Sequence, residues 1–250
     1  MKLVSETFST VLILSVLLAL LGVLSFYTFM SMAGFNTTTE YLYYRQAFLS
    51  IGNSLVIPMM GGSYEISIPM HQQSIGYSKV GEIIFYFNNS ATPSQILECI
   101  GLVSGLRGYS RSNSTIYGSN SYIVNDSRLI VRVLETYNSG ESRLYLDTCR
   151  LWVESEVTRS SSGILFFYRI FYYNLTVKMQ YGERARGLIR VSMTGSPITY
   201  YGYAQNMTIR FSDRIHGRDI VASTSNLSST PPGTPLIYIL TIYNVEIEVK

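Results

Sequence analysis

The sequence predicts an α+β protein in which a long apolar N-terminal helix precedes a mainly antiparallel β-sandwich body. Three observations lead to this prediction. The stretch from Thr7 to Thr39 has no charged side chain, the apolar period changes from helical to two after Leu55, and strand patterns then recur between Ser-, Asn- and Gly-rich turns. We place the helical region at 1–54 and the β-rich region at 55–250, with a candidate subdivision near 158–163.

The segment from Val11 to Met30 is predominantly apolar and has about the length that crosses the hydrocarbon layer of a membrane as a helix. A cleaved secretory signal peptide is the alternative. Its apolar region is usually shorter, about 7–15 residues, and the small-residue site near 31–34 fits a signal peptidase poorly. Lys2 before the span gives only a weak indication that the N-terminus lies inside. The sequence therefore favours a membrane anchor over a removed signal.

An amphipathic stretch follows the apolar segment. After a polar break at 36–39, Tyr41, Tyr44, Phe48 and Ile51 recur at helical spacing. This stretch is either a second helix or a continuation of the first. In both cases its apolar face needs a partner.

The body shows period-two alternation, most clearly at the C-terminus, where Tyr243, Val245, Ile247 and Val249 alternate with polar residues. The run Ile164–Tyr173 is apolar on both faces, which predicts a central strand covered on each side or facing a neighbouring subunit. Further strand patterns are found at 64–68, 82–87, 129–134, 143–146, 151–157, 174–181 and 206–211. The pattern as a whole is typical of an antiparallel sandwich with one or two sheet regions.

One short helix is expected within this body, near 93–104. Thr92 and Pro93 match an N-cap followed by proline at the first helical position, and Gln95 completes a capping box. Gly105 provides a stop.

Seven N-x-S/T sequons occur, which is somewhat more than chance predicts for a chain rich in Asn, Ser and Thr. Several fall in predicted loops or on polar strand positions, where a sugar is solvated. Occupied sequons would place the body outside the cytoplasm; unmodified surface asparagines are the alternative. The candidate acceptors are Asn36, Asn88, Asn113, Asn125, Asn174, Asn206 and Asn226.

The two cysteines, Cys99 and Cys149, have no CxxC companions, so neither matches a zinc or thioredoxin-like pattern. In an oxidising compartment they could form one disulfide. Two buried free thiols remain an equal alternative.

We predict no catalytic centre, metal or cofactor. His71 and His216 lack the spacing of a metal pair, and we expect each at a surface or turn. The segment Gly101–Gly105, GLVSG, is one position out of register with a nucleophile elbow. No phosphate-binding glycine loop occurs, and the net charge of +3 gives no reason to expect nucleic acid. The densest basic group, Arg184, Arg186 and Arg190, is interpreted as a solvated hairpin.

Ser5 and Glu6 precede the apolar run, an aromatic amphipathic helix follows, and a β body comes after it. This arrangement resembles that of archaeal type IV pilin-like proteins, and the resemblance covers mainly residues 1–55. It implies that the N-terminal helices pack as the apolar core of a filament, with the β domains outside. It further implies that Glu6 compensates charge or sets register there. The sequence departs from the family at the processing site, where only Met1–Val4 precede Ser5.

These observations lead to two expectations for function. The first is a structural subunit or minor pilin of a surface filament, which contacts membrane lipid and copies of itself or related subunits and exposes a glycosylated β domain for adhesion. The second is an uncleaved, membrane-anchored binding or stator module whose extracellular C-terminal domain grips a surface-layer or other envelope protein. A membrane-tethered hydrolase is a third possibility with little support.

Overall fold

The computed structural model describes residues 2–55, 62–68, 74–107, 113–138, 140–160, 163–180, 187–223 and 236–250. The chain divides into two compact units, Met1–Leu42 and Tyr43–Lys250. The boundary expected at residues 54 and 55 therefore falls inside the second unit, because the last turns of the helix belong to the β-rich body.

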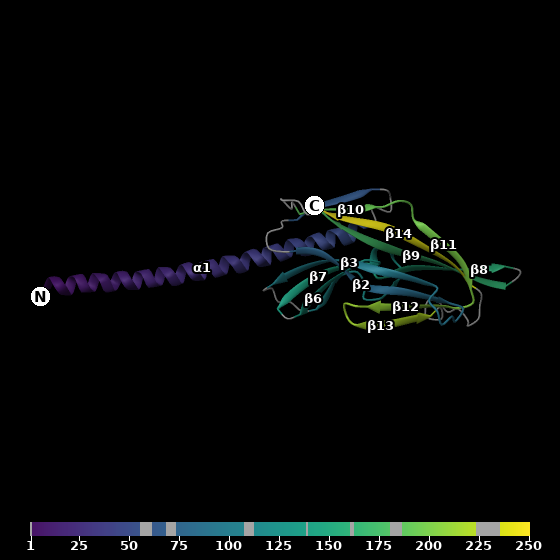
Figure 1. Cartoon of the computed structure of the whole chain (residues 1–250), viewed down its shortest axis with the longest axis horizontal. Helices are drawn as coiled ribbons and strands as arrows, with labels where there is room; N and C mark the ends of the chain where they lie inside the picture. Colours follow the sequence, from purple (N-terminus) through teal and green to yellow (C-terminus); the bar gives the residue numbers. More distant parts are fainter. Residues whose placement is uncertain are drawn as a thin grey trace. The chain divides into compact units, whose positions relative to one another are not determined.

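A single helix, α1, runs from Lys2 to Ser54 (Figure 1). The amphipathic stretch is thus a continuation of the apolar helix. The hydroxyls of Ser15 and Thr28 donate to the carbonyls of Val11 and Leu24, so these polar groups are satisfied within the helix itself. From Val11 the helix is long and apolar enough to cross a membrane.

The two halves of α1 differ in burial. The large apolar side chains from Val11 to Phe35 are exposed. In the second unit, Tyr44, Phe48 and Ile51 are fully buried, as expected from their helical spacing. Gly52 lies against Tyr117 and Val133 of the body, where a Cβ would make ordinary van der Waals contacts of 3.4 and 3.5 Å.

Strands form two seven-stranded, curled sheets. In sheet A, β14 pairs with β9 in parallel and β5 pairs with β8 in parallel, and the other pairs are antiparallel. The order is β1 (Ser63–Ser67), β10 (Leu188–Met193), β14 (Leu236–Val249), β9 (Gly163–Met179), β8 (Leu151–Ser160) and β5 (Ile123–Val124), and β11 (Ile198–Ala204) also pairs with β14.

Sheet B is antiparallel throughout. A short 3-10 helix, Ser127–Leu129, precedes β6. The order is β13 (Arg218–Ser223), β12 (Met207–Asp213), β2 (Ser74–Phe87), β3 (Gln95–Arg107), β7 (Glu141–Asp147), β6 (Arg132–Asn138) and β4 (Ser114–Tyr117).

Both sheets contribute to one apolar core. Sheet A supplies the inward face of β9, including Tyr168 and Ile170, and sheet B supplies Phe85, Ile209 and Phe211. These side chains alternate with more exposed ones along their strands, as period two requires. The body therefore holds together through apolar burial between sheets in addition to its backbone ladders.

The central-strand prediction for Ile164–Tyr173 is confirmed, because β9 lies between β14 and β8. Its outward face is only partly covered: the ring of Phe171 stacks on Trp152, with centroids 4.2 Å apart, but Phe167 and Phe171 are half-buried and Arg169 is exposed. Cover on both faces is therefore not confirmed. Of the segment at 158–163, the described residues Thr158–Ser160 and Gly163 belong to β8 and β9, which pair antiparallel within one sheet.

The prediction of a helix near 93–104 is wrong. These residues enter β3, which pairs with β2 on one side and β7 on the other. The β-branched residues Ile96, Ile100 and Val103 suit a strand, and the two neighbouring ladders outweigh the local capping signal at Thr92. Gly101 fits because a Cβ there would lie 2.6 Å from Val80 and 2.9 Å from the Leu146 carbonyl.

Candidate functional site

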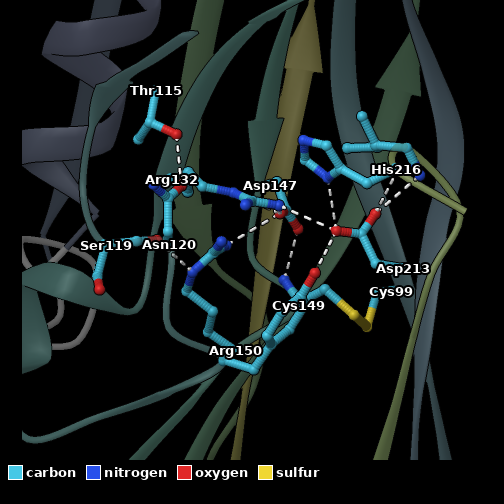
Figure 2. Close-up of polar contacts among 12 residues, drawn as sticks. Cys99, Thr115, Ser119, Asn120, Arg132, Asp147, Cys149, Arg150, Asp213 and His216 are labelled. Atoms are coloured by element: carbon cyan, nitrogen blue, oxygen red, sulfur yellow. Dashed lines mark hydrogen bonds and ion pairs between the residues drawn. A yellow bond between two sulfur atoms is a disulfide. The ribbon is translucent and has the colours of Figure 1, made fainter. Parts of the chain in front are cut away.

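The candidate site is a buried cluster of charged residues on the concave side of sheet B (Figure 2). It joins β6 and β12, which are separated in the sheet by β2, β3 and β7. Arg132 on β6 approaches Asp213 on β12, with 3.5 Å between Nη2 and Oδ2. Such a contact is possible only because the sheet curls strongly.

Asp147, at the end of β7, binds both arginines of the cluster. Its Oδ2 accepts from Arg132 Nη2 at 2.8 Å and from Arg150 Nη1 at 2.9 Å, and its Oδ1 accepts from the Cys149 backbone N–H at 2.8 Å. Burial alone raises the pKa of this carboxyl, but the charges of Arg150 and Arg132 outweigh it, so the pKa lies below its ordinary value. Asp147 is therefore ionised and saturated with donors.

Asp213 is the second anion. Its Oδ1 accepts from the backbone N–H groups of Ile215 and His216, at 2.8 and 3.1 Å. Its Oδ2 accepts from the Tyr122 hydroxyl and lies 2.7 Å from His216 Nδ1. Desolvation raises the pKa of Asp213, but the hydrogen bonds from Tyr122 and His216 prevail and hold it below the usual range.

Tyr122 comes from the segment just before β5 and lies between the two arginines. The Cζ atoms of Arg132 and Arg150 lie 5.9 and 5.8 Å from its ring centroid, within cation–π range. Burial, followed by the hydrogen bond to Asp213, raises the pKa of Tyr122 to about 12. The phenol is therefore a hydrogen-bond donor at any physiological pH.

A disulfide lies beside the cluster. Cys99 on β3 is bonded to Cys149, with their Cα atoms 5.2 Å apart, so the alternative of two free thiols does not apply. The bond joins β3 to the segment that follows β7. It also holds the Asp147–Arg150 segment in place next to the ion pairs.

A solvent-open pocket of about 710 Å³ lies over the cluster. One wall comes from β4 and β6, through residues such as Thr115 and Leu134, and the other from β12 and β13, through residues such as Phe211 and Arg218. Since β13 and β4 are the two edges of sheet B, the curl of the sheet brings its edges to either side of the pocket. Arg132 and His216, which belong to the charged cluster, also line the pocket.

The cluster can hold the curled sheet in shape, and the pocket has the size of a small-ligand site. Among the described residues, no group of three or more His, Cys, Asp or Glu side chains is arranged to hold a metal ion. Two arginines and two aspartates balance their charges, which is the condition for burying them.

The structure does not gather the predicted glycosylation asparagines into one site. Asn125 is exposed, Asn88 and Asn113 are exposed with their carbonyl oxygens bonded to the Gln205 and Tyr137 N–H groups, and Asn206 is half-buried. The amide of Asn174 donates to Asn244 within sheet A. Asn226 and the side chain of Asn36 lie outside the described residues.

The remaining predicted residues are also dispersed. His216 occupies a turn, as expected, but it belongs to the cluster. His71, Arg184 and Arg186 lie outside the described residues, as does the side chain of Glu6. Arg190 pairs with Glu65 across β10 and β1, at 3.2 Å.

Sequence reasoning missed Arg132, Asp147, Arg150, Asp213 and Tyr122. Two signals were present. Asp213 continues the apolar phase of Met207, Ile209 and Phe211, and Arg132 interrupts the apolar run 129–134. A charge on the buried phase of a strand requires a buried partner, but the sequence does not say which one.

The chain matches no protein-family model, and no curated protein or solved structure is significantly similar to it.

Proposed function

We propose that this chain is a non-catalytic subunit or minor component of a type IV pilus-like surface filament, which assembles through the apolar part of α1 and displays its β body outside the cell. Within this proposal the body is a β-sandwich, and its exposed sequons at Asn125 and Asn88 carry glycans. The partners of the helix are membrane lipid before assembly and copies of this or related chains afterwards.

The observation that carries the proposal is the division of one continuous helix into two kinds of surface. From Val11 to Phe35 its large apolar side chains are exposed, whereas Tyr44, Phe48 and Ile51 are buried in the second unit. An exposed apolar rod of this length is unfavourable in water and requires lipid or other apolar helices around it. The apolar part continues in the same helix into the part that is buried in the second unit, so helix and body belong to one covalent subunit.

The proposal is tested by replacing Leu17, Leu20, Leu21 and Leu24 with serine in the full chain. We expect the variant to leave the membrane and filament fractions and to appear as a soluble monomer. The matched control replaces the exposed aromatic residues Tyr200, Tyr201 and Tyr203 of β11 with serine, which removes apolar surface without touching α1. That control should fractionate like the wild type.

A second variant, Glu6→Gln, separates a filament subunit from a permanently anchored module. A subunit should lose filaments in negative-stain microscopy while staying membrane-bound, because only packing among helices needs the carboxylate. Unchanged fractionation with no filaments from either wild type or variant would favour the stator-like alternative. A wild-type chain that is a dissolved monomer in the cytosol would refute both.

A further inference from the structure

The groups that the pocket over the charged cluster offers to a ligand include several hydrogen-bond donors and a cation. The two carboxylates of the cluster, Asp147 and Asp213, do not line the pocket and are occupied by the arginines, Tyr122, His216 and backbone N–H groups. They are therefore not available to accept hydrogen bonds from a ligand.

The carbonyl oxygens of two amides at the rim already have a partner within the body. Asn113 Oδ1 accepts from the Tyr137 backbone N–H at 2.7 Å, and Asn120 Oδ1 accepts from the Thr115 hydroxyl at 2.6 Å. At both residues the NH₂ group can donate to a ligand. The rim thus offers donors to whatever enters.

A cationic side chain completes this arrangement. Arg218, at the start of the edge strand β13, borders the pocket and is exposed, and the described part of the chain gives it no ion pair. Its guanidinium matches a carboxylate in a fork-to-fork geometry. The acidic residue at the border, Glu135, follows Leu134 on β6, so strand alternation turns its side chain to the face where Val133 meets Gly52.

The other part of the wall is apolar. Leu134 on β6 and Ile220 on β13 lie on opposite sides of the pocket. The hydroxyl-bearing residues Ser114 and Ser121 also line it. A ligand must therefore combine an anionic group, several oxygen acceptors and C–H surface. A volume of about 710 Å³ accommodates one or two sugar rings.

We propose that this pocket binds a carboxylate-bearing saccharide, of the uronic or sialic acid type, with the carboxylate on Arg218 and the ring oxygens on the amides of Asn113 and Asn120. This site is independent of how α1 is packed. It would make the body a lectin-like module.

The test uses the full chain in detergent, produced without N-glycans so that Asn113 is unmodified. Calorimetric titrations compare glucuronic acid, galacturonic acid and N-acetylneuraminic acid with glucose, galactose and N-acetylglucosamine, and with inorganic phosphate. We expect at least one acidic sugar to bind, and to bind at least about tenfold more tightly than the neutral sugars and phosphate, since a charge-assisted pair distinguishes them.

Variants locate the site. Arg218→Gln should weaken binding of the acidic sugar by about ten- to a hundredfold, and Arg218→Lys should weaken it less, because it keeps the charge but loses the fork. The matched control is Arg210→Gln on the adjacent strand β12, where the side chain pairs with Asp219 and does not border the pocket. It should leave affinity unchanged, and near-UV circular dichroism should show that all three variants fold.

The proposal is overturned if no acidic sugar binds, or if neutral sugars bind equally well. Binding of phosphate as tight as that of the sugars would show a simple anion site and would also overturn it. So would an equal loss of affinity in Arg210→Gln, because the effect would then be one of overall charge.

Discussion

The apolar core and the charged cluster occupy neighbouring parts of the same body, yet they depend on their residues in different ways. Core residues such as Ile209 and Phe211 contact one another without direction, so that similar volumes can replace them at modest cost. In the cluster each charge depends on a particular partner, and Arg132 and Asp213 come from strands that are not neighbours. We infer that the core makes the sheets pack, whereas the cluster defines how sheet B curls.

The largest expected effect is that of Asp147→Ala. Removing this carboxylate leaves Arg132 and Arg150 buried without their main counter-charge, so the free energy of unfolding should fall by about 3–5 kcal/mol. Chemical denaturation of the full chain in detergent, followed by circular dichroism, measures the change. The exposed pair offers a control, since Asp219→Ala should have no measurable effect. Equal stability of the two variants would contradict a special role for the cluster.

Opening the disulfide should have the next largest effect. The bond between Cys99 and Cys149 closes a loop with a sequence separation of 50, and its loss should cost about 2–4 kcal/mol, mainly through greater freedom of the unfolded chain. The double variant Cys99→Ser, Cys149→Ser should match the wild type measured in reductant. If the reductant lowered the stability of the double variant as well, the effect would not come from this bond.

Tyr122→Phe sharpens the comparison by removing one hydroxyl from the cluster without changing its charges. We expect a loss of about 1.5 kcal/mol at neutral pH, because Asp213 loses one donor and keeps the others.

The same variant has a distinct pH dependence. The pKa of Tyr122 is raised from 10.0 to about 12 in the folded state, so its contribution is complete below pH 10 and disappears as the pH rises from 10 to 12. Unfolding measured between pH 9 and about 12 should therefore show a smaller difference between wild type and variant at the alkaline end. A difference that grows with pH would contradict the assignment.

Ile209→Val should have the smallest effect, a loss of about 1 kcal/mol, because one methylene group leaves a core that can partly relax. Thermal unfolding in detergent is sufficient to detect it. A loss as large as that of Asp147→Ala would mean that core and cluster are equally specific.

Several elements could be predicted because their signal is local. The helical spacing of Tyr44, Phe48 and Ile51 gave a buried helix face, and the alternation from Tyr243 to Val249 predicted a strand that the structure contains as part of β14. Residues 95–107 show the limit. Their capping signal was local too, but pairing with β2 and β7 overrode it, and those ladders join residues far apart in the chain.

By itself, the sequence determined the long apolar helix, the β-rich body and the positions where sugars could be attached, since length, period and short motifs are properties of neighbouring residues. Only the tertiary structure decided that Cys99 and Cys149 are bonded, that α1 is one helix, and that Arg132, Asp147 and Asp213 meet beneath a pocket. The physical reason is that a buried charge is stable only beside its partner, and the curl of a seven-stranded sheet selects that partner.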